Sequence, residues 1–211
     1  MFRNALILFL LLVFSLPAYA GWVDITSGTT QPLARASFYN NDTGFVVGYG
    51  STILKTTDGG RTWIRLASAP VEDFWAVKAV SENQIFVSSV SSKNFYKFDT
   101  SNNNVQIISS AAFPVAILGM YLKDSNNLSA VGLFSHINTY NYFTTANGGT
   151  SWNYSTIEAP GGATFETASV YFVGNDGWIG GRYSYSGIML SLIAKTEDGG
   201  ATWRMEKCVS S

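Results

Sequence analysis

The sequence predicts an all-β fold in which a unit of four antiparallel strands occurs four times, and three observations carry this prediction. The pattern Thr-x-[Asp/Asn]-Gly-Gly-x-[Ser/Thr]-Trp occurs three times, at residues 56–63, 145–152 and 196–203. A degenerate copy at 96–105 fills the long gap, so the acidic or amide position recurs at intervals of 41, 48 and 51 residues, at Asp58, Asp99, Asn147 and Asp198. Beyond residue 20, no window of about 11 residues keeps a helical period of apolar side chains. Repeats of this length are typical of the four-stranded blades of a β-propeller.

Each unit begins with two short apolar strands joined by a polar turn. The predicted pairs are, in order, 36–38 with 43–48, 76–80 with 84–88, 119–122 with 127–132, and 169–172 with 176–181. Short runs of β-formers bounded by Gly, Asn and Asp are typical of strands joined by hairpins. A third strand then enters the repeated pattern and a fourth strand leaves it, so we expect the repeats to end near residues 66, 108, 156 and 206.

The repeated pattern, which we name the box, has the chemistry of a tight turn between the third and fourth strands. Two adjacent glycines allow positive φ, and an Asp or Asn oxygen accepts hydrogen bonds from backbone N–H groups across the turn. The Trp returns the chain to the apolar layer between neighbouring sheets. We therefore expect structural rather than catalytic roles for Thr56, Asp58, Gly60, Thr62, Trp63, Thr145, Asn147, Gly149, Ser151, Trp152, Thr196, Asp198, Gly200, Thr202 and Trp203.

Composition and charge exclude several classes of function. The chain has 13 basic and 14 acidic side chains, a balance that argues against a nucleic-acid partner, whose binding needs a basic surface. One histidine, His136, rules out a multi-histidine metal site, and one cysteine, Cys208, rules out an intramolecular disulfide. The sequence contains no phosphate-binding loop, metal-ligand cluster or nucleophile elbow, so we expect no cofactor.

Residues 1–20 have the layout of a secretory signal peptide. Arg3 lies in a short polar start, residues 5–16 are almost entirely apolar, and Ala18 and Ala20 supply small side chains at a cleavage site. The apolar run is shorter than the roughly 20 residues of a membrane-spanning helix. We expect export to the periplasm or secretion and a mature propeller domain at 21–211, the alternative being an uncleaved N-terminal anchor.

The boxes resemble Asp-boxes, also called bacterial neuraminidase repeats. Together with the preceding Gly-Phe/Trp-Val/Ile-x-Gly segments at 44–48 and 177–181, they make residues 34–205 similar to the photosystem II stability and assembly factor family. Propellers of that family usually have six to eight blades, whereas four repeats occur here. A four-bladed ring, an open arc and half of a larger ring completed by a second copy all remain open.

The resemblance implies a non-enzymatic scaffold that docks a protein partner, an envelope or membrane protein, through one propeller face. Tyr-rich loops suit such contacts, and the candidate partner surface combines two predicted hairpin loops through His136, Tyr140, Tyr142, Arg182, Tyr183 and Tyr185. The alternative is a sialidase-like glycoside hydrolase or a glycan-binding surface protein. Hydrolysis needs two carboxyl groups flanking the scissile bond, and Glu158 and Glu166 form a candidate pair on a predicted surface loop.

Overall fold

The computed structural model describes residues 24–66, 70–92, 94–108, 116–132, 142–155, 157, 164–185 and 187–206. These residues form four antiparallel sheets, each of four strands in sequence order. This confirms the predicted all-β fold of four blades. No helix within these ranges is both long and apolar enough to cross a membrane.

The blades follow one another along the chain. Blade 1 contains β1 (Leu33–Phe38), β2 (Gly44–Gly48), β3 (Thr52–Thr56) and β4 (Ile64–Arg65). Blade 2 contains β5 (Phe74–Ala79), β6 (Gln84–Ser89), β7 (Phe95–Asp99) and β8 (Asn104–Ile108). Blade 3 contains β9 (Ile117–Leu122), β10 (Leu128–Gly132), β11 (Tyr142–Thr145) and β12 (Asn153–Ser155). Blade 4 contains β13 (Thr164–Val173), β14 (Asp176–Tyr185), β15 (Ile188–Thr196) and β16 (Arg204–Glu206).

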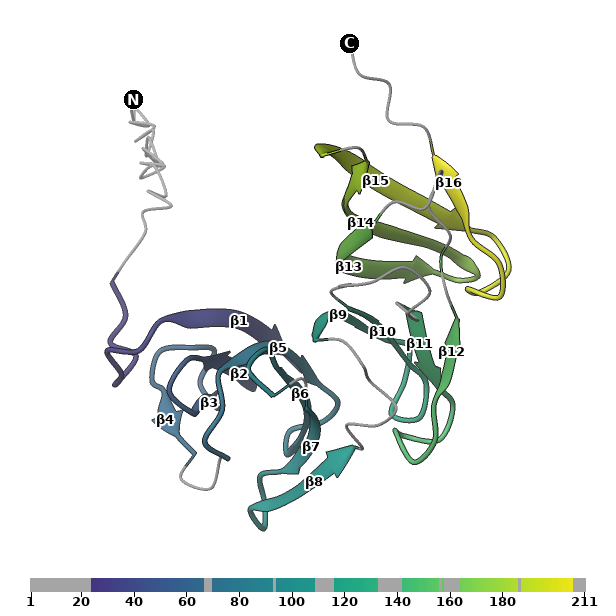
Figure 1. Cartoon of the computed structure of the whole chain (residues 1–211). Coiled ribbons are helices and arrows are strands. Elements are labelled where there is room, and N and C mark those ends of the chain that lie inside the picture. The colour runs from purple at the N-terminus through teal and green to yellow at the C-terminus, as the bar shows by residue number, and fades with distance from the viewer. Residues whose placement is uncertain are drawn as a thin grey trace, which may run out of the picture.

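The first strand of each blade lies innermost. The strands β1, β5, β9 and β13 together line a small cavity of about 180 Å³, to which Arg35 and Met120 contribute. The remaining strands of each blade extend outward from this centre, and the four blades follow each other in an arc (Figure 1).

The apolar core lies between successive sheets. Alternate residues of a strand point to opposite faces, so a blade with two neighbours buries both faces. Phe45 of blade 1 packs in one cluster with Val87 of blade 2, and Phe86 of blade 2 packs in the next cluster with Phe143 of blade 3. A third cluster joins Tyr142 of blade 3 to blade 4. Each fully buried side chain of this size contributes about 1.5–3 kcal/mol to folding.

The arc is open. Three apolar clusters connect blades 1 to 2, 2 to 3 and 3 to 4, and in the described part of the chain no cluster joins blade 4 to blade 1. Figure 1 shows blades 1 and 4 at the two ends of the arc. The sequence analysis allowed a four-bladed ring, an open arc or half of a larger ring, and the single chain adopts the open arc.

Blade 4 departs from the predicted strand lengths. Residues 182–187 were predicted as a long turn, but Arg182–Tyr185 belong to β14, and Tyr185 pairs with Ile188 of β15. That part of the prediction is wrong because tyrosines favour strands and Gly187, at φ 79°, allows a tight connection between the two strands.

Candidate functional site

The first box is a closed network of local hydrogen bonds. The Thr56 hydroxyl donates to Asp58 Oδ1 at 2.8 Å, and the Gly60 N–H donates to Thr56 Oγ1 at 2.9 Å. Thr62 donates to Asp58 through its backbone N–H at 2.9 Å and its hydroxyl at 2.6 Å. Gly59 and Gly60 have φ of 72° and 88°, the left-handed region that glycine adopts without strain. These bonds, led by that of the Thr62 hydroxyl, lower the pKa of Asp58 to about 2.

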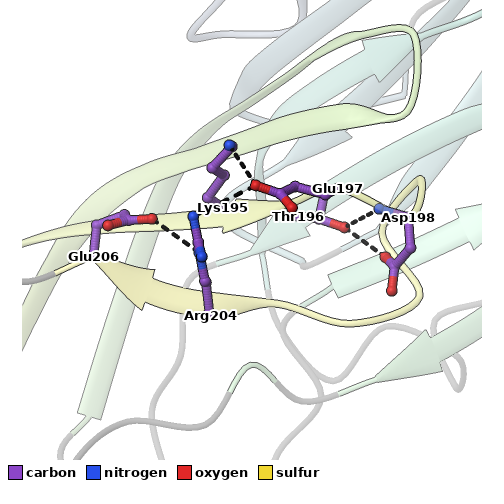
Figure 2. Close-up of polar contacts among 6 residues, drawn as sticks. All are labelled: Lys195, Thr196, Glu197, Asp198, Arg204 and Glu206. Carbon is purple, nitrogen blue, oxygen red and sulfur yellow. Dashed lines mark hydrogen bonds and ion pairs between the residues drawn. The ribbon is translucent and has the colours of Figure 1, made fainter.

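The other two boxes repeat this geometry. The Thr196 hydroxyl donates to Asp198 Oδ1 at 2.6 Å, as Figure 2 shows, and the Thr202 N–H donates to the same atom at 2.9 Å. Hydrogen bonds from Thr196 and Thr202 hold the pKa of Asp198 well below its usual range. In the third repeat the uncharged side chain of Asn147 takes the place of the aspartate. Its Oδ1 accepts a hydrogen bond from the Ser151 N–H at 2.9 Å. Each acidic or amide group therefore bonds within its own turn.

The box tryptophans are half-buried, and two of them contact the preceding blade. Trp152 meets Phe95 with ring centroids 5.4 Å apart, and Trp203 meets Tyr142 at 5.1 Å. Trp63 begins the arc and contacts Phe38 of its own blade at 6.1 Å. The aromatic contact that a box tryptophan makes between two sheets thus depends on which side chain the preceding blade places against it.

The candidate partner surface is not brought together as predicted. Tyr142 is 2% exposed and lies in the core between blades 3 and 4, so its prediction as a surface residue is wrong. The cause is the alternation of β11, which turns Tyr142 toward Trp203. His136, Tyr140 and Glu158 lie outside the described residues.

The remaining residues of that surface lie on β14. Arg182 is exposed, whereas Tyr183 is half-buried beside Leu192 and Met205. Tyr185 is the last residue of the strand. Arg182, Tyr183 and Tyr185 remain a predicted surface, now on a strand rather than on a loop. Glu166, the candidate carboxyl group, was predicted on a surface loop, which is wrong: it lies on β13, paired in register with Arg182.

A second feature recurs between the blades and was missed from the sequence. On β3, Lys55 pairs in register with Phe45, and its ammonium lies 5.6 Å from that ring. It also donates to Asn83 Oδ1 of blade 2 at 2.9 Å. Between blades 2 and 3, Lys97 lies 5.7 Å from the Phe86 ring and donates to a blade 3 carbonyl, that of Gly148, at 3.3 Å. We name this position between two blades the lysine slot.

Between blades 3 and 4 the lysine slot contains no lysine. The register positions of Phe45 and Lys55 are taken there by Ser129 and Thr144, which pair across β10 and β11. A pocket of about 260 Å³ opens at this place. It is bounded by Tyr121, Lys123, Asn127, Leu128, Ser129, Thr144, Thr145, Ala146, Asn153, Phe172, Gly174, Asn175 and Gly199.

On its blade 4 side, this pocket has the same kind of hydrogen-bond acceptors that bind the lysine ammonium in the other slots. Gly148 donates its N–H to the Asn126 carbonyl, and Gly199 donates to the Asn175 carbonyl, both at 2.9 Å. Gly199 and Asn175 are therefore the counterparts of Gly148 and Asn126, and both line the pocket. The sequence carries a signal for this difference. Lys55 and Lys195 directly precede the first and third boxes, whereas Thr144 precedes the second.

The polar groups of the pocket are amides, hydroxyls and one ammonium. Lys123 lies exposed at its rim, and its charge adds to hydrogen bonds from Asn127 and Asn126 in lowering the pKa of Asp124. Within the described ranges, no three His, Cys, Asp or Glu side chains are grouped so as to hold a metal ion. The arrangement suits binding of a polar or cationic side chain through neutral acceptors.

Comparison with known proteins identifies the fold. No protein-family model matches the sequence, and no curated protein matches it. The chain is similar to the solved structure of an ancestral GH74 enzyme, with a TM-score of 0.66 and 18% identity over 86% of this chain and 25% of that one. It thus spans about a quarter of that enzyme.

Two smaller proteins are also similar. YCF48 bound to a D1 peptide gives a TM-score of 0.55 and 14% identity over 90% of this chain and 85% of that one. The computationally designed Ika4 protein gives 0.51 and 12% identity over 81% and 97%. At such identities the comparisons show a β-propeller fold, as predicted, and leave the function to be argued from the site.

Proposed function

We propose that the chain is a non-enzymatic binding module that docks a protein partner on its propeller, and that the open slot between blades 3 and 4 receives a lysine side chain of that partner. The observation that carries this proposal is the replacement of a slot lysine by Thr144 beside a pocket of about 260 Å³. YCF48, a propeller of similar fold, has been solved with a D1 peptide bound, which supports a protein ligand for this chain.

The lining of the pocket favours an ammonium group. In the neighbouring interface the same arrangement binds an ammonium: Lys97 donates to the Gly148 carbonyl, and the Gly148 N–H donates to the Asn126 carbonyl. Asn175 and Gly199 offer the same acceptors on blade 4. A hydrogen bond that involves a charged group is worth about 1.5–3 kcal/mol, so one lysine gives a weak contact that further contacts on the partner must strengthen.

Lys123 modulates this contact. Its ammonium lies at the rim of the pocket and repels an incoming cation, although the charge of Asp124 beside it offsets part of that repulsion. The Lys123→Ala variant is therefore expected to bind a lysine ligand more tightly than the natural chain, most clearly at low salt.

The test is a titration of the isotope-labelled protein with N-acetyl-lysine methylamide, followed by NMR. Shifts are expected at Asn175 and Gly199, and N-acetyl-norleucine methylamide, which lacks the ammonium, is expected to leave them unchanged. In Thr144→Lys, a lysine from the chain itself fills the slot, so the shifts should disappear. Thr150→Lys is the matched control, since Thr150 is exposed in the same box and the first box has Arg61 at this position. Equal shifts with both ligands, or undiminished shifts in Thr144→Lys, would overturn the proposal.

A glycan is the second candidate ligand. The pocket combines an aromatic side chain, Tyr121, with the amides of Asn127, Asn153 and Asn175, and such groups bind sugar hydroxyls. Glycoside hydrolysis requires two carboxyl groups, whereas the polar side chains of this lining are amides, hydroxyls and an ammonium. Titration with neutral oligosaccharides in the same NMR assay separates this candidate from the lysine ligand.

We also propose that the protein works outside the cytoplasm. The support is the signal-peptide layout of residues 1–20, with Arg3, an apolar run and small side chains at 18 and 20. An envelope or membrane protein is then the expected partner. We further propose that the three boxes are structural Asp-boxes, because each one closes its own turn by local hydrogen bonds.

A further inference from the structure

The outer face of blade 4 repeats the face that other blades bury. Trp178 pairs in register with Lys195, as Phe45 pairs with Lys55 in blade 1 and Phe86 with Lys97 in blade 2. Both phenylalanines are fully buried, whereas Trp178 is 37% exposed. Tyr171, Val173 and Ile193, on the same face, are 61%, 63% and 44% exposed. An apolar group of this kind on a surface marks an interaction site.

The outer face of blade 1 is the complementary surface. In blades 3 and 4 the box tryptophan packs against the preceding blade, on Phe95 and Tyr142 respectively. Trp63 is half-buried against Phe38, which is itself 46% exposed. In blade 4, Ile193 occupies the register position that Phe95 and Tyr142 occupy in blades 2 and 3. Blade 1 thus presents the tryptophan, and blade 4 presents the residue that such a tryptophan meets.

Charge is also complementary between the two faces. Asn126 and Asn175 lie on the sides of the inner interfaces that face a slot, and each accepts a hydrogen bond from a box glycine through its carbonyl. In blade 1 the same bond joins the Gly59 N–H to the Asp42 carbonyl at 2.9 Å, so Asp42 occupies their position. The slot lysine of blade 4 is Lys195, whose ammonium lies 2.7 Å from Glu197 of its own blade (Figure 2). A cation and an anion therefore stand at matching positions on the two open faces.

We propose that two copies of this chain pack head to tail, blade 4 of each on blade 1 of the other, and form a closed ring of eight blades. Two identical interfaces related by a two-fold axis close such a ring. Each interface reproduces the inner ones, with Trp63 against Ile193, and Lys195 beside Asp42 and the Gly59 carbonyl. A second copy is the occupant because the two faces complement each other as neighbouring blades of this chain do. Propellers of four to eight blades are known, so eight is within the range of the fold.

The test is the mass of the purified protein in solution, measured by sedimentation velocity and light scattering over a concentration series. A dimer is expected. Asp42→Lys and Lys195→Glu should each raise the dimer dissociation constant at least about tenfold, because each places like charges across both interfaces. The double variant D42K/K195E restores opposite charges and should return to within about threefold of the natural chain. Lys123→Glu, which changes an exposed lysine away from both faces, is the control.

Rescue by the double variant supports the ring even if a single variant folds poorly, because rescue requires that the two positions meet. A monomer at every concentration, including one that binds a different protein on this face, would overturn the proposal. Dimers that respond to neither single variant, or open assemblies larger than a dimer, would also overturn it.

Discussion

The box tryptophans offer a matched series in which one motif meets three different neighbours. Trp152 and Trp203 each pack on an aromatic ring of the preceding blade, whereas Trp63 at the open end contacts Phe38 of its own blade. Truncation of a fully buried Trp to Ala costs about 3–5 kcal/mol, and an aromatic pair adds about 0.5–1.5 kcal/mol beyond its buried area. These rings are half-buried, so we expect a loss of about 2–4 kcal/mol in the free energy of unfolding for Trp152→Ala and Trp203→Ala.

Trp63→Ala should cost the single chain less, about 1–2 kcal/mol, because no preceding blade covers that ring. The assay is urea unfolding followed by circular dichroism, in the D42K background and at a concentration where the protein is monomeric. Equal losses at all three positions would refute the reasoning that a tryptophan stabilises the fold through the preceding blade.

Three further predictions concern the turns and the slots. The Asp58 carboxyl has a pKa of about 2 against an ordinary 3.8, so its contribution to stability is present above pH 4 and is lost as pH falls through 2; acid titration of Asp58→Asn should show a smaller loss. Lys97→Met should lower the free energy of unfolding by about 1–2 kcal/mol in denaturant melts, because it removes a bond between two blades. Gly200→Ala should cost more than Gly174→Ala in the same melts: both have positive φ, but a Cβ at Gly200 meets the Tyr142 hydroxyl and one at Gly174 meets nothing within 4 Å.

The fold was predictable because its strongest signals are local. Two adjacent glycines, as at 59–60, and an Asp or Asn two residues after a Thr specify a turn whatever surrounds them. The turn and the tryptophan then repeat with the period of a blade, so the architecture follows without knowledge of long-range contacts. In blade 4 local signals were weaker, and the polar and aromatic residues 182–185 favoured a loop by composition although they pair as a strand.

The candidate site was less accessible because it depends on register and on the next blade. Tyr142 has a polar group and was predicted at the surface, but its exposure is decided by the alternation of β11 and by Trp203 of the following sheet. The open slot requires that Thr144 lie opposite Ser129 and face Asn175 of another blade. Such pairings join residues far apart in sequence, and only Thr144, which stands where a lysine precedes the first and third boxes, hints at them.

The structure of Thr144→Lys tests most directly whether the pocket between blades 3 and 4 is a vacant lysine slot. We predict that the introduced ammonium lies within hydrogen-bond distance of Asn175 Oδ1 or the Gly199 carbonyl, and that the pocket is filled. An introduced side chain that extends into solvent and leaves the pocket open would contradict the equivalence of the three interfaces.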